Sequence, residues 1–432
     1  MLNTPPIFAL LAFLVTFLLM MLRPFKITEG TAGLVGALLM FLLGFIRFVD
    51  IKIILDQTGN LLIMLFSMMV ISLIVEEAGF FRWFASLAAN KAQGNGKKLF
   101  LNTFLLGLAV TTVISNDATA LIITPIVWEY THLLNLDPLP FLLTCTFIAD
   151  TASLSLPVSN LTNILVYESM GLKFWDYIIL MFFPNLVASM INYLVFAWLF
   201  RKRIPHYIDQ SLLIKEPIAN PRYFKLATWG LLTITLGYVI GSAFGLPLWV
   251  IAFLGAIYMC LIAYYTNKTS LKTILPQVSW SVLLFVTGMF LVVKGLENSG
   301  LMTSFSTAIA NLTGKGLFNS ILTVTFGTAL GANVVNNVPM DMLMVSGLQK
   351  VKPFIEPKIF AVLPYSVIMG AGLGPNFTVI GSLATMLWLN LVRKKGYEIT
   401  ALQYSFFGLL TAPLMIFGAS LALYLIYNWL YI

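Results

Sequence analysis

The chain has 432 residues, of which 59% are hydrophobic and 10% are charged, and it carries a net charge of +8 at pH 7. Several stretches run for about 20 residues without a charge, the length that crosses the hydrocarbon core of a bilayer. This composition excludes a soluble globular protein and predicts a polytopic, all-α membrane protein embedded in a lipid bilayer. We attribute the positive charge to loops on one side of the membrane rather than to nucleic-acid binding.

Three spans and a re-entrant hairpin are predicted at the beginning of the chain. The first span lacks the basic leader and small-residue cleavage site of a signal peptide, so we expect it to be a mature helix. Residues 99–134 are too few for two spans and too many for one, and their centre is polar. A re-entrant hairpin with its tip at Ser115, Asn116 and Asp117 fits this length, because irregular backbone is tolerated where it is buried or lines a watery cavity. The spans and the amphipathic piece before the hairpin are expected at 5–22, 28–46, 60–76 and 79–92.

The next apolar run, residues 141–168, is predicted to be a broken span. Pro157 lies in its middle, where a proline frees backbone hydrogen-bonding groups. Small polar residues and one acid surround this proline, among them Asp150, Ser159 and Asn160. A span interrupted in this way suits a site inside the membrane better than a simple anchor.

A fifth span at 177–200 and a basic linker at 201–225 precede a second half, 226–432, that repeats the order of the first half, 1–200. Its hairpin is expected to turn at Asn336 and Asn337. The elements predicted for this half are spans at 226–244, 247–265 and 278–294, an amphipathic piece at 300–312, a hairpin at 317–348, a broken span at 359–392 and a last span at 401–429.

The two halves are predicted to be inverted-topology repeats. The hairpin tip and the following break are similarly spaced in both, with 43 residues from Asn116 to Ser159 and 45 from Asn336 to Gly381. Each half has five full spans, an odd number, so the second must be inverted relative to the first. About ten transmembrane helices, two re-entrant hairpins and discontinuous helices that meet at the midplane are typical of secondary transporters.

The distribution of basic residues supports this topology. With the linker in the cytoplasm, five spans place the amino terminus outside, and ten spans place the carboxyl terminus outside as well. Seventeen of the 25 lysines and arginines then lie inside and eight lie outside. This bias follows the positive-inside rule, and shifting one half by a span would put the basic clusters at Arg201 and Arg393 on opposite faces.

Four interruptions, the two hairpin tips and the two broken spans, are predicted to converge on one pocket. Helix ends there offer free N–H groups with partial positive charge, and broken spans offer free carbonyls. No arginine or lysine lies in these stretches, which argues against a polycarboxylate and favours a small neutral hydroxylated solute or a dehydrated ion. The predicted substrate-binding residues are Ser115, Asn116, Thr119, Ser159, Asn160, Asn336, Asn337, Asn376, Thr378 and Ser382.

Asp117 and Asp150 are the predicted proton-coupling residues. A carboxyl group in the membrane interior can exchange protons, because burial disfavours its charged form. The alternative for Asp117 is a helix cap, a role that is compatible with carrying a proton. Asp341, one turn past the second tip, is a weaker candidate that could instead bond locally. No cofactor or metal is predicted, because the cysteines and histidines show no metal-ligand spacing.

Five stretches carry a family resemblance: NDATALIITPIV at 116–127, FIADTASL at 147–154, VSNLTNI at 158–164, GLGPN at 372–376 and IGSLATMLW at 380–388. They resemble signatures of the arsenite/antimonite efflux permeases, a family of the ion transporter superfamily. Together the matching stretches extend the resemblance over nearly the whole chain. At the hairpin tips, sodium-coupled carboxylate carriers of the superfamily have Ser-Asn-Thr, whereas this chain has Ser-Asn-Asp and Val-Asn-Asn, which favours protons over a paired sodium site.

The resemblance implies export of arsenite and antimonite as neutral hydroxides across a bacterial cytoplasmic membrane. We expect proton antiport in which the hairpins and broken spans slide against the other helices. Some members of the family bind a soluble ATPase, so the resemblance also implies such a partner as an alternative source of energy. A sodium/proton antiporter, a silicic acid or organic-anion carrier and a channel remain open, whereas an intramembrane enzyme lacks support because no serine has a nucleophile-elbow context.

Overall fold

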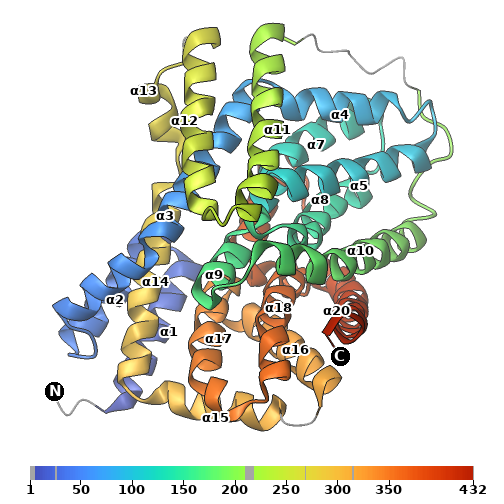
Figure 1. Cartoon of the computed structure of the whole chain (residues 1–432). Coiled ribbons are helices and arrows are strands. Elements are labelled where there is room, and N and C mark those ends of the chain that lie inside the picture. The colour runs from blue at the N-terminus through green and yellow to red at the C-terminus, as the bar shows by residue number, and fades with distance from the viewer. Residues whose placement is uncertain (1–4, 25–26, 210–217, 268, 314–315, 432) are drawn as a thin grey trace.

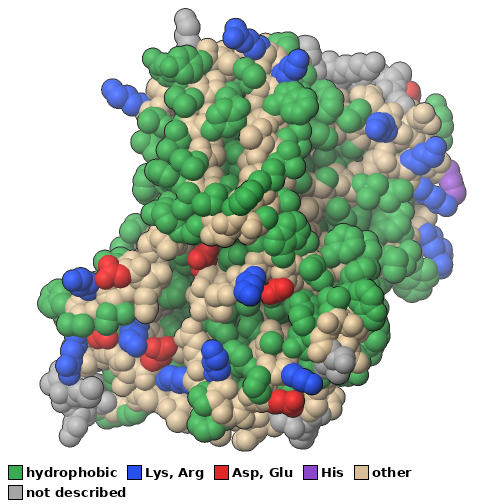
Figure 2. Space-filling model, viewed as in Figure 1, with side chains coloured by type: hydrophobic (Ala, Val, Ile, Leu, Met, Phe, Trp, Pro, Cys, Tyr) green, Lys and Arg blue, Asp and Glu red, His purple; other side chains and the backbone are tan. Residues whose placement is uncertain are grey.

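The computed structural model describes residues 5–24, 27–209, 218–267, 269–313 and 316–431. In this part the regular secondary structure is helical, apart from one isolated β-bridge between Asn95 and Tyr207. The predicted all-α class is confirmed. Exposed leucine, phenylalanine and tryptophan side chains cover the visible faces of α11 (Pro221–Ala243) and α12 (Leu248–Asn267), as lipid-facing helices require (Figure 2).

Eight helices of the described chain are long and apolar enough to cross a membrane. Three shorter apolar helices, Pro6–Leu22, Glu29–Leu42 and Leu139–Ser155, add to them. One of the eight, α16, belongs to the predicted second hairpin, so length alone does not separate a hairpin limb from a span. The eight are Phe48–Glu77, Phe174–Leu199, Pro221–Ala243, Leu248–Thr266, Trp280–Asn298, Leu317–Val335, Pro357–Asn376 and Ala401–Tyr431.

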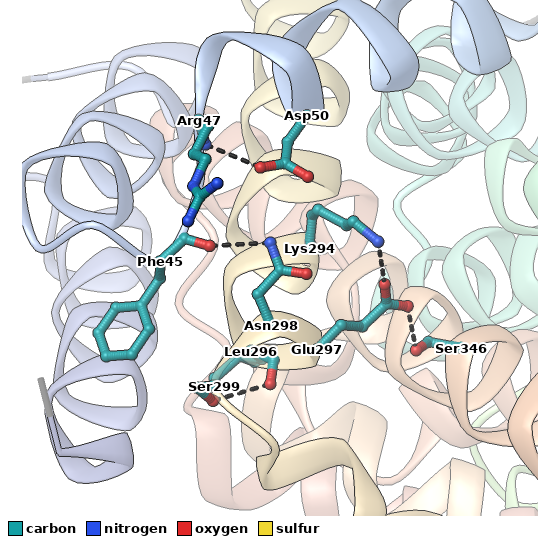
Figure 3. Close-up of polar contacts among 9 residues, drawn as sticks. All are labelled: Phe45, Arg47, Asp50, Lys294, Leu296, Glu297, Asn298, Ser299 and Ser346. Carbon is teal, nitrogen blue, oxygen red and sulfur yellow. Dashed lines mark hydrogen bonds and ion pairs between the residues drawn. The ribbon is translucent and has the colours of Figure 1, made fainter. Parts of the chain in front are cut away.

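The third predicted span, 60–76, begins too late in the chain. Helix α3 runs over Phe48–Glu77, so it starts twelve residues earlier. The charges near its beginning do not end the helix, because the Asp50 carboxylate accepts a hydrogen bond from the Arg47 N–H at 2.8 Å and caps it (Figure 3). A charged segment read as a loop is thus the first turns of a long helix.

Six helices form one side of the molecule, which we call the lateral group (Figure 1). In it α14 packs along α2, α3 along α12, and α11 along α12. The contact between α2 and α14 brings backbones together, since a Cβ on Gly288 would lie 2.4 Å from the Gly33 carbonyl carbon. The group consists of α1 (Pro6–Leu22), α2 (Glu29–Leu42), α3, α11, α12 and α14 (Trp280–Asn298).

The remaining long helices form the hairpin group, in which α10 packs on α20, α16 on α18 and α5 on α8. Two amphipathic helices, α4 (Phe80–Asn90) and α15 (Leu301–Thr313), follow α3 and α14 and connect the two groups (Figure 1). The hairpin group contains α5 (Gly96–Val113), α6 (Asn116–Ala118), α7 (Thr124–Leu133), α8 (Leu139–Ala152), α9 (Leu161–Met170), α10 (Phe174–Leu199), α16 (Leu317–Val335), α17 (Asn337–Val351), α18 (Pro357–Leu373), α19 (Leu383–Lys394) and α20 (Ala401–Tyr431).

The first hairpin turns between α5 and α6. After α6 the helix widens into a π-helical turn, η2 (Thr119–Ile123), before α7 begins. Pro125 has no N–H to donate to a residue four positions back, and a wider turn next to a proline accommodates that loss. The second hairpin turns between α16 and α17 at Asn336, whose φ of 72° is a conformation that asparagine tolerates better than most residues.

Both broken spans contain two short 3₁₀ turns between their helical limbs. They are η3 (Ser153–Ser155) and η4 (Pro157–Ser159) in the first, and η8 (Gly374–Asn376) and η9 (Val379–Gly381) in the second. The elements therefore follow in the same order in both halves of the chain: a long helix, an amphipathic helix, a hairpin, a broken helix and a final long helix.

The two groups meet where α14 packs against α17 and α3 packs against α9. At one end of this boundary, Ser346 of α17 donates a hydrogen bond to the carboxylate of Glu297 on α14 (Figure 3). Lys294 forms an ion pair with the same carboxylate at 3.0 Å. A side-chain contact thus crosses between the groups at a distance from the hairpin tips.

Candidate functional site

A cavity of about 420 Å³ lies between the lateral group and the hairpin group. All four interruptions of the hairpin group contribute to it, at the two tips and at the two broken spans. The hairpin group provides Ser115, Asn116, Asp117, Ala118, Leu121, Ile122, Val158, Asn160, Leu161, Ile164, Asn337, Val338, Ser382, Leu383, Ala384 and Leu387. The other side provides Glu29, Leu65, Met68, Met69, Ser72, Leu73, Glu76, Gln277, Ser279 and Val282.

Four helix N-termini meet at this cavity, those of α6, α9, α17 and α19. Three of them are capped by their own side chains. Ser115 accepts from the Ala118 N–H at 3.2 Å, Asn160 from the Thr162 N–H at 3.2 Å, and Ser382 from the Ala384 N–H at 3.1 Å. A cap satisfies only one of the free N–H groups of a helix end, and the end keeps a partial positive charge. The cavity therefore favours ligands that present oxygen atoms.

Six of the predicted site residues line the cavity together: Ser115, Asn116, Asp117, Asn160, Asn337 and Ser382. Asp117 is exposed, and in the described part of the chain its carboxylate has no hydrogen bond or ion pair. Asn116 and Asn337 are each 4% exposed, so their amides belong to the wall with only an edge open. At the hairpin tips and broken spans, the arrangement presents the carboxylate of Asp117 among amides and hydroxyls.

The other predicted substrate-binding residues lie in the wall rather than in the lining. Thr119 accepts a hydrogen bond from Thr111 across the first hairpin at 2.7 Å. The Asn336 amide donates to the Ile380 carbonyl at 3.1 Å, and the Asn376 amide donates to the Thr151 hydroxyl at 3.5 Å.

Ser159 and Thr378 are also in the wall, and each ties a broken span to the hairpin beside it. Ser159 donates to the carbonyl of Thr112 at 2.8 Å, and Thr378 donates to the side chain of Asn333 at 2.7 Å. In this conformation these polar groups hold the loops in place and do not face a solute.

Asp150, the second predicted proton-coupling residue, also lies behind the lining. It is 2% exposed, and its carboxylate accepts a hydrogen bond from the Thr385 hydroxyl at 3.2 Å. The amide of Asn116 lies within reach of the same carboxylate. Asp150 thus connects α8, α19 and the first hairpin tip, and it adjoins the site without opening into it.

The sequence did not point to Glu29 and Glu76, which line the cavity from α2 and α3. Glu29 forms an ion pair with Arg23 at 3.3 Å, and Glu76 has Arg82 as a charged neighbour. Both acids lie at the ends of spans, where charged residues are ordinary. Only the packing of α2 and α3 around the hairpin tips distinguishes them from interfacial residues.

The lining is apolar apart from these carboxylates and a set of amides and hydroxyls. Among the described residues that form it, none is a lysine or an arginine. A cavity of this kind has no cationic partner for an anion, and its hydrogen-bonding groups suit a small solute with hydroxyl groups.

Comparison with known proteins identifies the family. A profile of the arsenical pump membrane protein family (ArsB) matches residues 8–430. The chain belongs to this family. It is 33% identical over 393 residues to the arsenical pump membrane protein of Escherichia coli K12, covering 90% of this chain and 91% of that protein. The Yersinia enterocolitica protein of the same description is also 33% identical, over 394 residues and with the same coverage.

Membership confirms the resemblance that the motifs indicated. This arsenical pump family member is a multi-pass membrane transporter and not an enzyme. The YdaH transporter of Alcanivorax borkumensis superposes with a TM-score of 0.60 at 14% identity, covering 86% of each chain. Neisseria gonorrhoeae MtrF superposes with a TM-score of 0.51 at 13% identity, covering 86% of this chain and 83% of MtrF. At these identities the likeness concerns the fold alone.

Proposed function

We propose that this arsenical pump family member exports arsenite and antimonite as neutral hydroxides in exchange for protons, across a bacterial cytoplasmic membrane. The observation that carries the proposal is the composition of the cavity, which combines amides and hydroxyls with the unpaired carboxylate of Asp117 at the first hairpin tip. No lysine or arginine is among the described residues that line it. Trivalent arsenic and antimony are uncharged hydroxides near neutral pH. They donate and accept hydrogen bonds as the amides of Asn116, Asn160 and Asn337 require.

Asp117 is the proposed proton carrier at the cavity. It is exposed there and has no hydrogen-bond or ion-pair partner among the described residues, so nothing in the wall fixes its charge state. It would take up a proton on the outer side as the hydroxide leaves, and it would release that proton on the inner side as the next hydroxide binds. Asp150 is the second proposed proton-coupling residue, because its carboxyl group lies close enough to that of Asp117 for the charges of the two acids to interact.

An elevator-type movement of the hairpin group against the lateral group is the proposed mechanism. The limited packing between the groups and the repeated element order, taken as inverted repeats at 1–200 and 226–432, support it. The cavity lies beside Arg23 and Arg82, which the positive-inside rule assigns to the cytoplasm. This conformation would then face inward, with both chain termini outside and the linker at 201–225 inside.

Everted membrane vesicles provide the test of the antiport. An imposed proton gradient, acid inside, is expected to drive arsenite accumulation that collapses when a protonophore is added. Asp117→Asn keeps the size of the side chain and removes the exchangeable proton, so we expect accumulation to fall at least tenfold. Full coupled transport by that variant would remove Asp117 from the mechanism, and accumulation insensitive to the gradient would refute the antiport.

Substrate competition distinguishes the remaining carriers. Antimonite is expected to compete with arsenite, whereas silicic acid and organic anions are not expected to do so. Stimulation of transport by sodium in place of protons would favour a sodium-coupled carrier. A soluble ATPase that binds the cytoplasmic loops would raise arsenite accumulation when ATP is added. Accumulation that does not respond to ATP would indicate that the proton gradient alone drives transport.

A further inference from the structure

Asp341 is a buried acid that neither the cavity nor the mechanism above uses. It lies on α17, in the second turn of the helix after the tip at Asn336. Its side chain is 0% exposed, and among the described residues neither carboxylate oxygen has a hydrogen-bond partner. Both oxygens of Asp341 therefore lie in the interior without a donor.

The position of Asp341 on its helix places it beneath the cavity. Residues four apart on an α-helix lie on one face, so Asp341 is one turn behind Asn337, which lines the cavity. Ser346, five residues further on, is rotated by roughly 140° around the helix, since each residue turns by about 100°. Ser346 faces Glu297 on α14, so Asp341 faces away from that contact and toward the hairpin group.

No charged group on the surrounding helices pairs with Asp341. The described elements that pack against α17 are helices α9, α14, α15, α16 and α18 and the 3₁₀ turn η7 (Lys352–Phe354), whose Lys352 shares no described hydrogen bond or ion pair with Asp341. Helices α15 and α16 carry no titratable residue in the described chain. None of the charged or titratable residues on the other three shares a hydrogen bond or ion pair with Asp341 in the described structure. These residues are Tyr167 and Glu168 on α9, Lys294 and Glu297 on α14, and Lys358 and Tyr365 on α18.

A carboxylate that is ionised, fully buried and unpaired is strongly unfavourable, whereas a neutral carboxylic acid at the same place is tolerated far better. We propose that Asp341 carries a proton in this conformation and is a second proton-coupling residue of the transporter. This inference rests on the proposed antiport. It assigns one acid to each hairpin, Asp117 open to the cavity and Asp341 shielded one turn behind the other tip.

In this scheme the proton is bound and released by simple transfer to and from water. A carboxylate oxygen of Asp341 takes a proton from hydronium in the outer solution when the second hairpin faces outward, and water is left. After the movement inward the O–H bond stays shielded until the tip around Asn337 opens. Binding of the hydroxide solute at Asn337 moves that tip, water reaches Asp341, and the proton leaves to the cytoplasm.

Two transport assays in proteoliposomes test the coupling role. One measures arsenite accumulation driven by a proton gradient, and the other measures exchange of labelled for unlabelled arsenite at equal pH on both sides. Asp341→Asn mimics the protonated acid, so we expect exchange within about twofold of the wild type and gradient-driven accumulation reduced at least tenfold. Asp341→Glu restores a titratable group, and partial recovery of accumulation is expected.

The control variant is Asp56→Asn, which removes an exposed acid from α3 and should leave both assays unchanged. Gradient-driven accumulation by Asp341→Asn at the wild-type rate would overturn the proposal. Loss of exchange as well as accumulation in both Asp341 variants would also overturn it, because a purely structural role would act in this way. A wild type that exchanges arsenite but ignores the gradient would refute the antiport itself and Asp341 as its coupling residue.

Infrared spectroscopy tests the protonation itself without any transport measurement. A protonated carboxylic acid has a C=O stretching band that a carboxylate lacks, and the band shifts in deuterium oxide. The difference spectrum of wild type minus Asp341→Asn at neutral pH is expected to contain this band, and the corresponding spectrum for Asp56→Asn is not. A difference spectrum that shows carboxylate bands in its place would overturn the proposal even if the antiport is established.

Discussion

Asp150 shows how a buried acid can organise the wall of a site without touching the solute. Its carboxylate accepts a hydrogen bond from Thr385, at the start of α19, while Asp150 itself belongs to α8. The contact therefore joins the first broken span to the second. A residue with this position can transmit a change in the first hairpin to the second half of the chain.

Thr385→Val should weaken this connection. Valine has nearly the shape of threonine but offers no hydroxyl, so the buried carboxylate loses one of its donors at a cost of about 1–3 kcal/mol. We expect a lower apparent Tm of the detergent-solubilised protein. Thr411→Val is the matched control, because Thr411 is equally buried and donates only within its own helix, to the Phe407 carbonyl at 2.8 Å. Equal Tm values for the two variants would contradict the assigned role.

From the sequence we could predict which polar residues gather at the site. We could not predict which of them face the solute. Asn160 and Ser159 are neighbours in a broken span, and only the first opens to the cavity. In an irregular segment, side-chain direction does not follow a helical or strand period, so sequence spacing does not determine it. Glu76 was missed for a different reason: it lies at the end of a span, where charged residues are ordinary.

The second broken span is built around close contact of α18 with α16. A Cβ on Gly374 would lie 2.6 Å from the Ala329 Cα, and one on Gly370 would lie 2.5 Å from the Thr325 carbonyl oxygen. These two glycines let the backbones approach where the helix breaks. Small residues at helix contacts in membranes serve this purpose widely.

Gly374→Ala is expected to push the broken end of α18 away from α16. The added methyl group meets backbone rather than a flexible side chain, so overpacking should destabilise the fold by about 1–3 kcal/mol. The Tm of the variant and its rate of arsenite transport would both be lower than those of the wild type. Gly59→Ala, at a position with nothing within 4 Å of an added Cβ, should be neutral or stabilising. A stable, fully active Gly374→Ala protein would show that this contact is not needed.

The hairpin tips and the helix breaks were predictable at the scale of elements, because polar residues and prolines interrupt apolar runs at Asn116, Pro157, Asn336 and Pro375. The start of α3 and the π-helical turn at 119–123 were not. The first depends on a local cap that looks like a charged loop, and the second on how a proline is accommodated inside a packed hairpin.

Across the whole molecule, the contact of Ser346 with Glu297 stands out because it joins the two groups away from the cavity (Figure 3). Asn298 of α14 donates to the Phe45 carbonyl at 2.8 Å, so the end of α14 is fixed to the lateral group. Movement of the hairpin group along α14 must break the hydrogen bond of Ser346. That hydrogen bond therefore favours the conformation seen here.

Ser346→Ala should shift the balance toward the other conformation. Loss of this hydrogen bond removes ~1 kcal/mol of stabilisation, which changes the ratio of the present conformation to the outward-facing one about fivefold. Val345→Cys provides a reporter, because Val345 is 6% exposed in this conformation. In a background with Cys145→Ala and Cys260→Ala, its labelling by an impermeant thiol reagent added outside measures the change. Labelling should accelerate in Ser346→Ala. Ser299→Ala serves as control, because the Ser299 hydroxyl donates to the Leu296 carbonyl at 2.8 Å and accepts from the Leu301 N–H at 3.4 Å, so it does not contact the hairpin group. Equal acceleration in both variants would argue against this role.

The division into two groups could not be predicted from the sequence. Apolar periodicity shows that a helix is buried in lipid or protein, but it does not say which partner it meets, and α2 pairs with α14 across some 250 positions of chain. The similar order of elements in the two halves could be predicted, because it depends on motifs that lie along the chain.

The meeting of four helix N-termini with three carboxylates has a consequence for selectivity by oxidation state. The helix ends attract oxygen atoms, whereas Glu29, Glu76 and Asp117 repel negative charge at the same cavity. Pentavalent arsenic is an anion at neutral pH and trivalent arsenic is not. The electrostatic field of the cavity therefore allows neutral arsenite to bind and repels the arsenate anion. Arsenate should therefore fail to compete for arsenite transport, and replacing Glu29 and Glu76 by glutamine should weaken that discrimination.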